Sequence, residues 1–170
     1  MTTISARGLY KVFGKDPKKA IAALENGASR EELMEKGSTA AVIDASFDVE
    51  PGEIFVIMGL SGCGKSTLIR MVNGLLPASG GTLEIDGTPL TEMSESQLRE
   101  LRRDKISMVF QHFALLPHRT VQQNAAYGLE IKGVPKAERE EKAHEALRMV
   151  DLDGWADYMP GELSGGMQQR

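Results

Sequence analysis

The residues best suited to chemistry form one glycine-rich run, Gly59-Leu60-Ser61-Gly62-Cys63-Gly64-Lys65-Ser66. The run fits the pattern G-x-x-x-x-G-K-[ST], which cradles phosphate groups. Its glycines let the backbone turn so that N–H groups point at phosphate oxygens, and a following helix adds its positive N-terminus. Lys65 would reach the β- and γ-phosphates of a nucleotide, and the Ser66 hydroxyl would ligate Mg²⁺. The run predicts a nucleotide-binding site; the alternative is a glycine-rich turn without a ligand.

The segments on either side of this run would hold it in place. Residues 54–58 are apolar and rich in β-branched side chains, which predicts a short buried strand. After the run, Leu68, Ile69, Val72 and Leu75 follow at helical spacing. The motif therefore stands between a predicted strand and a predicted helix, as phosphate binding requires.

Length and composition indicate one ordinary globular domain. The chain has 170 residues, of which 41% are hydrophobic and 26% charged, and its net charge of −4 argues against a nucleic-acid-binding surface. The longest apolar run, residues 54–58, is too short to span a bilayer, and we expect no signal peptide at the N-terminus. Cys63 is the single cysteine, so an internal disulfide is excluded and a reducing compartment is favoured.

Residues 16–37 predict a small helical insertion between two strands. Asp16-Pro17 has the residue types of an N-cap followed by proline at the first helical position. Ser29 and Glu32 have the spacing of a capping box for a second short helix. The alternative for this segment is a mobile surface loop.

The remaining elements are predicted from alternation, short apolar runs and capping signals. Period-two alternation, apolar runs and the tight Asp86-Gly87 turn predict strands within residues 4–13, 43–49, 82–90 and 106–110. Ser94 with Gln97 and Thr120 with Gln123 would cap helices. The predicted helices begin near residues 94, 120 and 136, and the last two reach about residues 131 and 150.

Two further motifs give the chain a family resemblance. Leu163-Ser164-Gly165-Gly166 is similar to the signature motif of ABC transporter ATPases, and Val109-Phe110-Gln111 is similar to their Q-loop. Counted from Lys65, Gln111 lies 111 − 65 = 46 residues on and Ser164 lies 164 − 65 = 99 residues on, which agrees with the family's order and spacing. The chain therefore resembles the ATP-binding subunits of ABC transporters over nearly its whole length.

The resemblance implies a fold and its subdivision. We expect an α/β fold: a P-loop core sheet, an antiparallel β portion and a helical subdomain. Residues 1–170 would form part of one ABC ATPase domain. Its parts would be an insertion at residues 16–37 and the P-loop core with the β portion at residues 38–111. The helical subdomain would follow at residues 112–163 and the signature motif at residues 163–170.

The resemblance also implies a role for each matching residue. Phe13 matches the aromatic residue that stacks on adenine; the alternative is a core phenylalanine at a strand end. Lys65 and Gln111 would be catalytic, and Ser66 and Gln111 would contact Mg²⁺. The signature residues would face the γ-phosphate held by a partner subunit. Cys63 stands at a variable position, where a small filler residue is the alternative. The residues expected to contact ATP are Phe13, Gly59, Ser61, Gly62, Cys63, Gly64, Lys65, Ser66, Thr67, Ser164, Gly165 and Gly166.

Several segments resemble one branch of the family, the glycine betaine/proline/choline uptake systems. These segments are residues 9–14, 52–62 and 113–118, together with the N-terminal insertion. The resemblance implies ATP-driven import of quaternary amines or proline at the inner face of the cytoplasmic membrane. Its partners would be a second ATP-binding subunit in a head-to-tail homodimer, membrane-spanning permease subunits and, indirectly, a substrate-binding protein. Residues 114–127 would contact the permease; the alternative is that they pack the subdomain's own core.

The motifs that normally follow the signature do not follow it here. Neither an apolar run ending in Asp-Glu nor a switch histidine comes after residue 166, and His112, His118 and His144 all precede the signature. We therefore expect the chain to be the N-terminal part of a longer ATPase. The alternatives are a non-catalytic nucleotide-binding fragment, the ATPase of another importer branch, and an ABC protein without a transport role.

Overall fold

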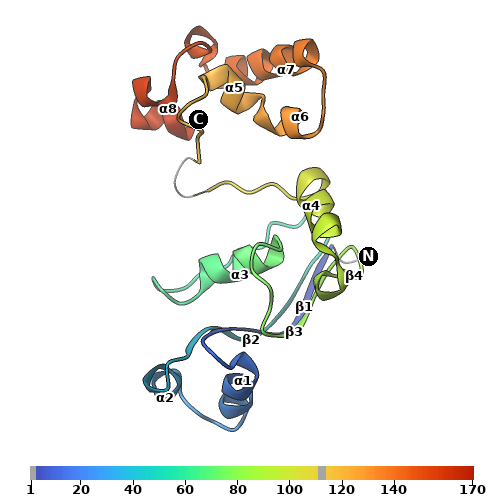
Figure 1. Ribbon diagram of the computed structural model, residues 1–170, viewed down its shortest axis with the longest axis vertical. Helices are drawn as coiled ribbons and strands as arrows, with labels where there is room; N and C mark the ends of the chain where they lie inside the picture. The colour runs from blue at the N-terminus through green and yellow to red at the C-terminus, as the bar shows by residue number, and fades with distance from the viewer. Residues whose placement is uncertain (1–2, 111–113) are drawn as a thin grey trace. The chain divides into compact units, whose positions relative to one another are not determined.

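The chain divides into two compact units, an N-terminal unit (Met1–Arg102) and a C-terminal unit (Arg103–Arg170). The computed structural model describes residues 3–110 and 114–170 (Figure 1). The sheet belongs to the N-terminal unit, and the described part of the C-terminal unit is built from helices. Across the described residues, no helix combines the length and the apolar character needed to cross a membrane.

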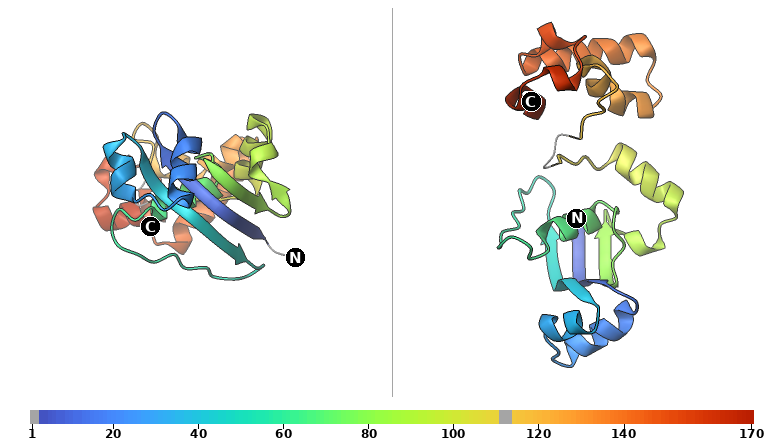
Figure 2. Two further views of the ribbon diagram at one scale, coloured as in Figure 1. Left: turned by 90° about the horizontal axis from the view of Figure 1, so that it is seen from below. Right: turned by 60° about the vertical axis from the view of Figure 1, so that its left-hand side comes forward.

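A four-stranded antiparallel sheet organises the N-terminal unit. Its order is β2-β1-β3-β4, with β1 (Ile4–Phe13) between β2 (Thr39–Val49) and β3 (Gly80–Ile85) (Figure 2). The short β4 (Thr88–Pro89) pairs with β3 across the predicted turn, where Asp86 has φ +49° and Gly87 +74°. Positive φ at both central residues is the signature of a hairpin turn whose twist matches the strands. The predicted antiparallel portion is therefore confirmed.

The insertion folds as two helices, α1 (Pro17–Glu25) and α2 (Arg30–Glu35). The Asp16 carboxylate accepts a hydrogen bond of 3.1 Å from the Lys19 amide, and Ser29 and Glu32 form the predicted capping box. Both helices pack on the sheet through a small apolar cluster: Val12, Ala20, Leu33 and Ala40. The predicted helices are thus present, and burial of one face of each holds them against the strands.

Two more helices follow the strands of this part of the chain. Helix α3 (Lys65–Val72) begins inside the run, at Lys65, and buries Met71. Helix α4 (Glu95–Asp104) comes after a short 3₁₀ turn, η1 (Leu90–Glu92). The Ser94 hydroxyl accepts from the Gln97 amide at 3.3 Å while the Gln97 side chain accepts from the Ser94 amide at 2.8 Å, so the predicted capping box is confirmed.

Two strand predictions are wrong. Residues 54–58 and 106–110 belong to no strand, and several of their apolar side chains are exposed, Ile54 at 90% and Val109 at 98%. An apolar run becomes a strand only when its backbone hydrogen-bonds to a neighbour, and none of the four described strands pairs with either run. Phe55 has a partner in the sheet, because its ring stacks on Phe47 of β2 at a centroid distance of 5.1 Å.

The C-terminal unit is organised around one apolar cluster made of Leu147, Leu152, Ala156 and Leu163. Its elements are α5 (Val121–Ala125), α6 (Tyr127–Ile131), α7 (Lys136–Met149), η2 (Asp153–Trp155), η3 (Pro160–Glu162) and α8 (Gly165–Gln169). The predicted helix from residue 120 to about 131 is divided at Ala126, whose φ −77° and ψ −10° tighten the turn between α5 and α6. The Thr120–Gln123 capping box and the helix beginning at residue 136 are confirmed.

Candidate functional site

The glycine-rich run forms a loop that leads into the N-terminus of α3. Gly62 has φ +78° and Gly64 has φ +98°, both in the left-handed region that favours glycine. Gly64 is the N-cap of α3, and a Cβ placed on it would collide with the backbone carbonyl oxygen of Ala41 in β2. The glycine therefore serves two needs: it permits the turn, and it lets the start of α3 approach the sheet.

Lys65 lies across the loop that precedes it. Its Nζ donates to the carbonyl oxygens of Gly59 at 2.8 Å and Leu60 at 2.6 Å, and it lies 3.7 Å from the Cys63 Sγ. The loop thus carries a positive charge at its centre, held by the backbone of the loop itself. Cys63 is exposed beside this charge, so a reagent in solution can reach the thiol.

The first turn of α3 supplies the remaining groups of this site. Ser66 and Thr67 stand in that turn, where amide N–H groups have no partner within the helix. Free amides at a helix N-terminus together with an ammonium group fit an anion such as a phosphate. The Ser66 hydroxyl is a hard oxygen ligand of the kind Mg²⁺ takes, alongside water and substrate phosphates. The residues present therefore fit a phosphate group with a bound Mg²⁺.

Phe13 lies at the end of β1 nearest this loop. It pairs with Thr39 of β2, two residues before the Ala41 carbonyl that Gly64 approaches. Phe13 is 45% exposed, so a flat ligand can reach it. The structure therefore brings the predicted base-stacking residue and the predicted phosphate loop to one end of the same pair of strands.

Lys11 is a neighbour of Phe13 that the sequence analysis missed. Its Nζ lies 5.2 Å from the centroid of the Phe13 ring and donates to the Pro77 carbonyl at 2.7 Å, and the residue is only 9% exposed. A cation near a ring face is attracted by the ring's quadrupole, so Lys11 helps to fix the orientation of Phe13. A lysine inside an alternating strand looks like a solvated residue, and no sequence signal marks it as buried.

The predicted signature residues stand together in the C-terminal unit. Ser164 is the N-cap of α8, with its hydroxyl accepting from the Met167 amide at 3.3 Å, and Gly165 and Gly166 open the helix. All three are exposed. Gln111 lies outside the described residues. The role of the signature residues toward a nucleotide stays a prediction.

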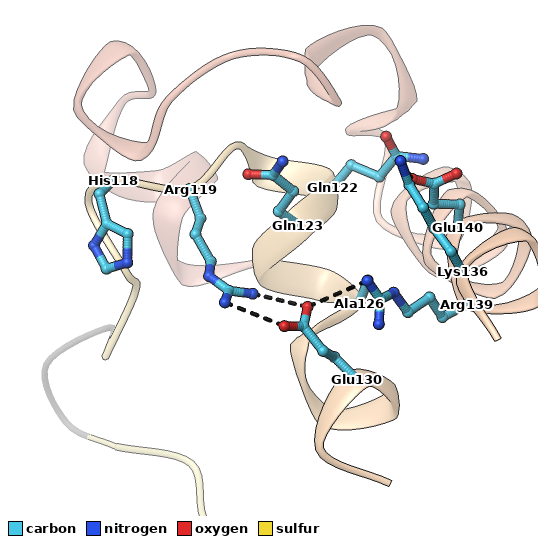
Figure 3. A pocket seen from close by; sticks show the side chains of 9 residues that line it. All are labelled: His118, Arg119, Gln122, Gln123, Ala126, Glu130, Lys136, Arg139 and Glu140. Atoms are coloured by element: carbon cyan, nitrogen blue, oxygen red, sulfur yellow. Dashed lines mark hydrogen bonds and ion pairs between the residues drawn. The ribbon is translucent and has the colours of Figure 1, made fainter. Parts of the chain in front are cut away.

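The C-terminal unit also contains a polar cavity of about 450 Å³ (Figure 3). Glu130 lies in its wall and accepts from Arg119 at 2.9 and 3.2 Å, while Arg139 lies 3.6 Å away. The hydrogen bond from Arg119 and the charges of both arginines lower the pKa of the Glu130 carboxyl below its usual value. Arg119 also lies over the Tyr127 ring at 4.9 Å, so this cluster ties α6 to the preceding loop and to α7.

Comparison with known proteins agrees with these features. The sequence profile of the ABC transporter family matches residues 42–170. The chain is 55% identical over 168 residues to the glycine betaine transport ATP-binding protein OpuAA of Bacillus subtilis, covering 98% of this chain and 40% of that protein. It is 51% identical to the glycine betaine/proline betaine transport system ATP-binding protein ProV of Salmonella typhimurium, covering 98% of this chain and 42% of that protein.

A solved structure supports the same assignment at the level of the fold. An ATP-binding cassette in a dimeric post-hydrolysis state, bound to ADP and Pi, matches with a TM-score of 0.78 and 29% identity. The match covers 98% of this chain and 65% of that chain. The chain spans about two fifths of the length of the two curated relatives named above. The predicted α/β P-loop fold is confirmed, and the chain belongs to the ABC transporter family.

Proposed function

We propose that the protein is the ATP-binding and ATP-hydrolysing subunit of a transporter that imports quaternary amines such as glycine betaine, proline betaine or choline, or proline. The observation that carries the ATP part is the loop at residues 59–64, whose glycine turn, central Lys65 ammonium and following helix fit phosphate. The substrate part is supported by identity of 51–55% to relatives whose names specify glycine betaine transport.

In this proposal each predicted site residue has a separate role in binding MgATP or in positioning water. Lys65 and the first amides of α3 hold the β- and γ-phosphates, and the Ser66 hydroxyl holds Mg²⁺. Phe13 stacks on the adenine ring, and Gln111 contacts Mg²⁺ and the attacking water. When bound, Mg²⁺ would neutralise phosphate charge; the residues themselves would position water for an in-line attack and would form no covalent intermediate.

The proposal includes a second copy of the chain and membrane partners. Ser164, Gly165 and Gly166 would present a hydroxyl and helix N-terminal amides to the γ-phosphate held by the other subunit. A head-to-tail dimer with two-fold symmetry satisfies both sites at once. Residues 114–127 would contact permease subunits at the inner face of the cytoplasmic membrane, with a substrate-binding protein delivering the amine to the permease. The division into insertion, core, helical subdomain and signature motif also remains part of this proposal.

Nucleotide binding by calorimetry tests the phosphate site. Lys65→Ala should abolish most ATP affinity, because the triphosphate loses its main positive partner. The exposed Lys18 of α1 makes a matched control, and Lys18→Ala should bind ATP as the parent does. Ser66→Ala should retain Mg²⁺-free binding but lose the gain in affinity that Mg²⁺ provides. Equal ATP affinity in Lys65→Ala and the parent would overturn the phosphate site.

Transport measured in vesicles tests the substrate class. The ATP-binding subunit, reconstituted with its permease and binding protein, should support uptake of glycine betaine, proline betaine or choline in the presence of ATP, and Gln111→Ala should abolish uptake. ATP turnover without uptake of any of these compounds, together with uptake of a different solute, would place the protein in another importer branch. Nucleotide binding without turnover in the assembled transporter would favour a non-catalytic role.

A further inference from the structure

A second cavity lies between the two helices of the insertion, away from the phosphate loop. It has a volume of about 480 Å³, within the range of small-molecule sites. Its walls come from the start of α1, from α2 and from the connections beside them, and Figure 1 shows the two helices side by side. All of its lining residues fall within residues 15–38, so it is separate from the loop at residues 59–64.

Three lysines stand at this cavity: Lys15, Lys19 and Lys36. All three are exposed, and within the described residues none of their ammonium groups has an ion pair or hydrogen-bond partner. The one carboxylate of the lining, Asp16, accepts from the Lys19 amide at 3.1 Å and so caps α1. The charge of the lining is therefore 3 − 1 = +2.

The floor of the cavity is apolar. Ala20 and Leu33, exposed by only 5% and 3%, belong to the cluster that joins the insertion to the sheet, and Ala23 packs against it. A ligand that fits must therefore carry a negative group for the lysines and an apolar body for the floor. A simple inorganic anion would leave the apolar floor uncovered.

We propose that this cavity binds a small organic phosphate ester. A phosphate monoester carries about −1.5 to −2 charges at pH 7, which matches the +2 charge of the lining. Its three oxygens accept hydrogen bonds from ammonium groups, and its organic part covers Ala20, Ala23 and Leu33. The insertion thereby gains a ligand site independent of the nucleotide site.

Fluorescence polarisation with 4-methylumbelliferyl phosphate tests the proposal. The probe joins a phosphate to a flat apolar ring system, and the uncharged 4-methylumbelliferone is its matched control. The full chain carrying Lys65→Ala serves as the protein, so that the phosphate loop does not contribute. We expect saturable binding of the phosphate ester and at least ten-fold weaker binding of the uncharged compound.

Lysine variants locate the binding. Single changes Lys15→Gln, Lys19→Gln and Lys36→Gln should each weaken binding about 2- to 5-fold, as expected for exposed charge pairs, and the triple variant about 10-fold or more. Lys18→Gln is the matched control, because Lys18 stands on the same helix but lines a different cavity. Ala23→Leu should weaken binding of the ester by filling the floor while leaving every lysine in place. The single variants keep the test decisive if the triple variant folds poorly.

Three results would overturn the proposal. The first is equal affinity of the parent, the triple variant and Lys18→Gln. The second is equal binding of the uncharged compound, which would make the site merely apolar. The third is lysine-dependent binding to phosphatidylglycerol vesicles that the soluble ester does not compete away, which would assign the lysines to a membrane surface.

Discussion

Replacing Gly64 by alanine tests how the phosphate loop is joined to the sheet. Alanine at φ +98° incurs the strain of the left-handed region, about 1–2 kcal/mol. Its Cβ would also collide with the carbonyl oxygen of Ala41, a backbone atom that cannot swing aside as a side chain can. Relieving such overpacking costs typically about 1–3 kcal/mol. The sum is a loss of about 2–5 kcal/mol in the free energy of unfolding of the N-terminal unit.

Gly62 offers a matched control within the same loop. Its φ of +78° also lies in the left-handed region, but a Cβ there would meet no atom within 4 Å. Gly62→Ala should therefore cost only the backbone strain, about 1–2 kcal/mol. The difference between the two variants isolates the contact with β2 and should be about 1–3 kcal/mol.

Thermal unfolding followed by two probes measures this difference. Far-UV circular dichroism reports on both units, whereas the fluorescence of Trp155, the one tryptophan, reports on the C-terminal unit. The N-terminal unit, Met1–Arg102, has about 100 residues, and for a unit of that size the difference between the variants corresponds to about 4–24 °C in Tm. The Trp155 transition should stay unchanged. Equal destabilisation by the two substitutions would refute the close approach of α3 to β2.

Three further predictions concern other residues. Phe13→Ala should weaken ATP binding by about 1–3 kcal/mol and Phe13→Tyr should be nearly neutral; reduced thermal stability with unchanged affinity would make Phe13 a core residue. A bulky thiol reagent on Cys63 should block ATP binding, and MgATP should slow labelling; labelling rates indifferent to MgATP would contradict this placement. Because Arg119 lowers the pKa of Glu130 below its ordinary value of 4.5, the stabilisation is complete above pH 4.5 and is lost as pH falls through the lowered pKa. The difference in unfolding free energy between parent and Glu130→Gln should shrink over that range, and a pH-independent difference would refute the pair.

Local signals in the sequence predicted the local structure well. The Ser29–Glu32, Ser94–Gln97 and Thr120–Gln123 capping boxes all form, because each is a reciprocal pair of hydrogen bonds between residues three apart. The Asp86-Gly87 turn forms because its positive φ angles suit those residue types. Such features depend on neighbours along the chain, so a sequence pattern is enough to predict them.

Pairing and burial were predicted less well. Residues 54–58 read as a buried strand, but a strand also needs a neighbour to share its backbone hydrogen bonds, and the described strands do not supply one. The predicted helix across residues 120–131 is divided because the backbone of Ala126 tightens the turn between α5 and α6; Ala126 is only 4% exposed. No sequence pattern indicated that the side chain of Lys11 lies beside the ring of Phe13.

The sequence by itself predicted the phosphate loop and determined the family and the order of the motifs, because these depend on residue types at fixed spacing along the chain. Only the tertiary structure decided which of these residues meet. It brings Phe13, at the end of β1, and the start of α3 to the same end of the β1–β2 pair. It also shows why residue 64 is a glycine: a Cβ there would collide with the carbonyl oxygen of Ala41. It also gathers Lys15, Lys19 and Lys36 at one cavity. The physical reason is that contacts between distant residues depend on how strands and helices pack, which no local pattern encodes.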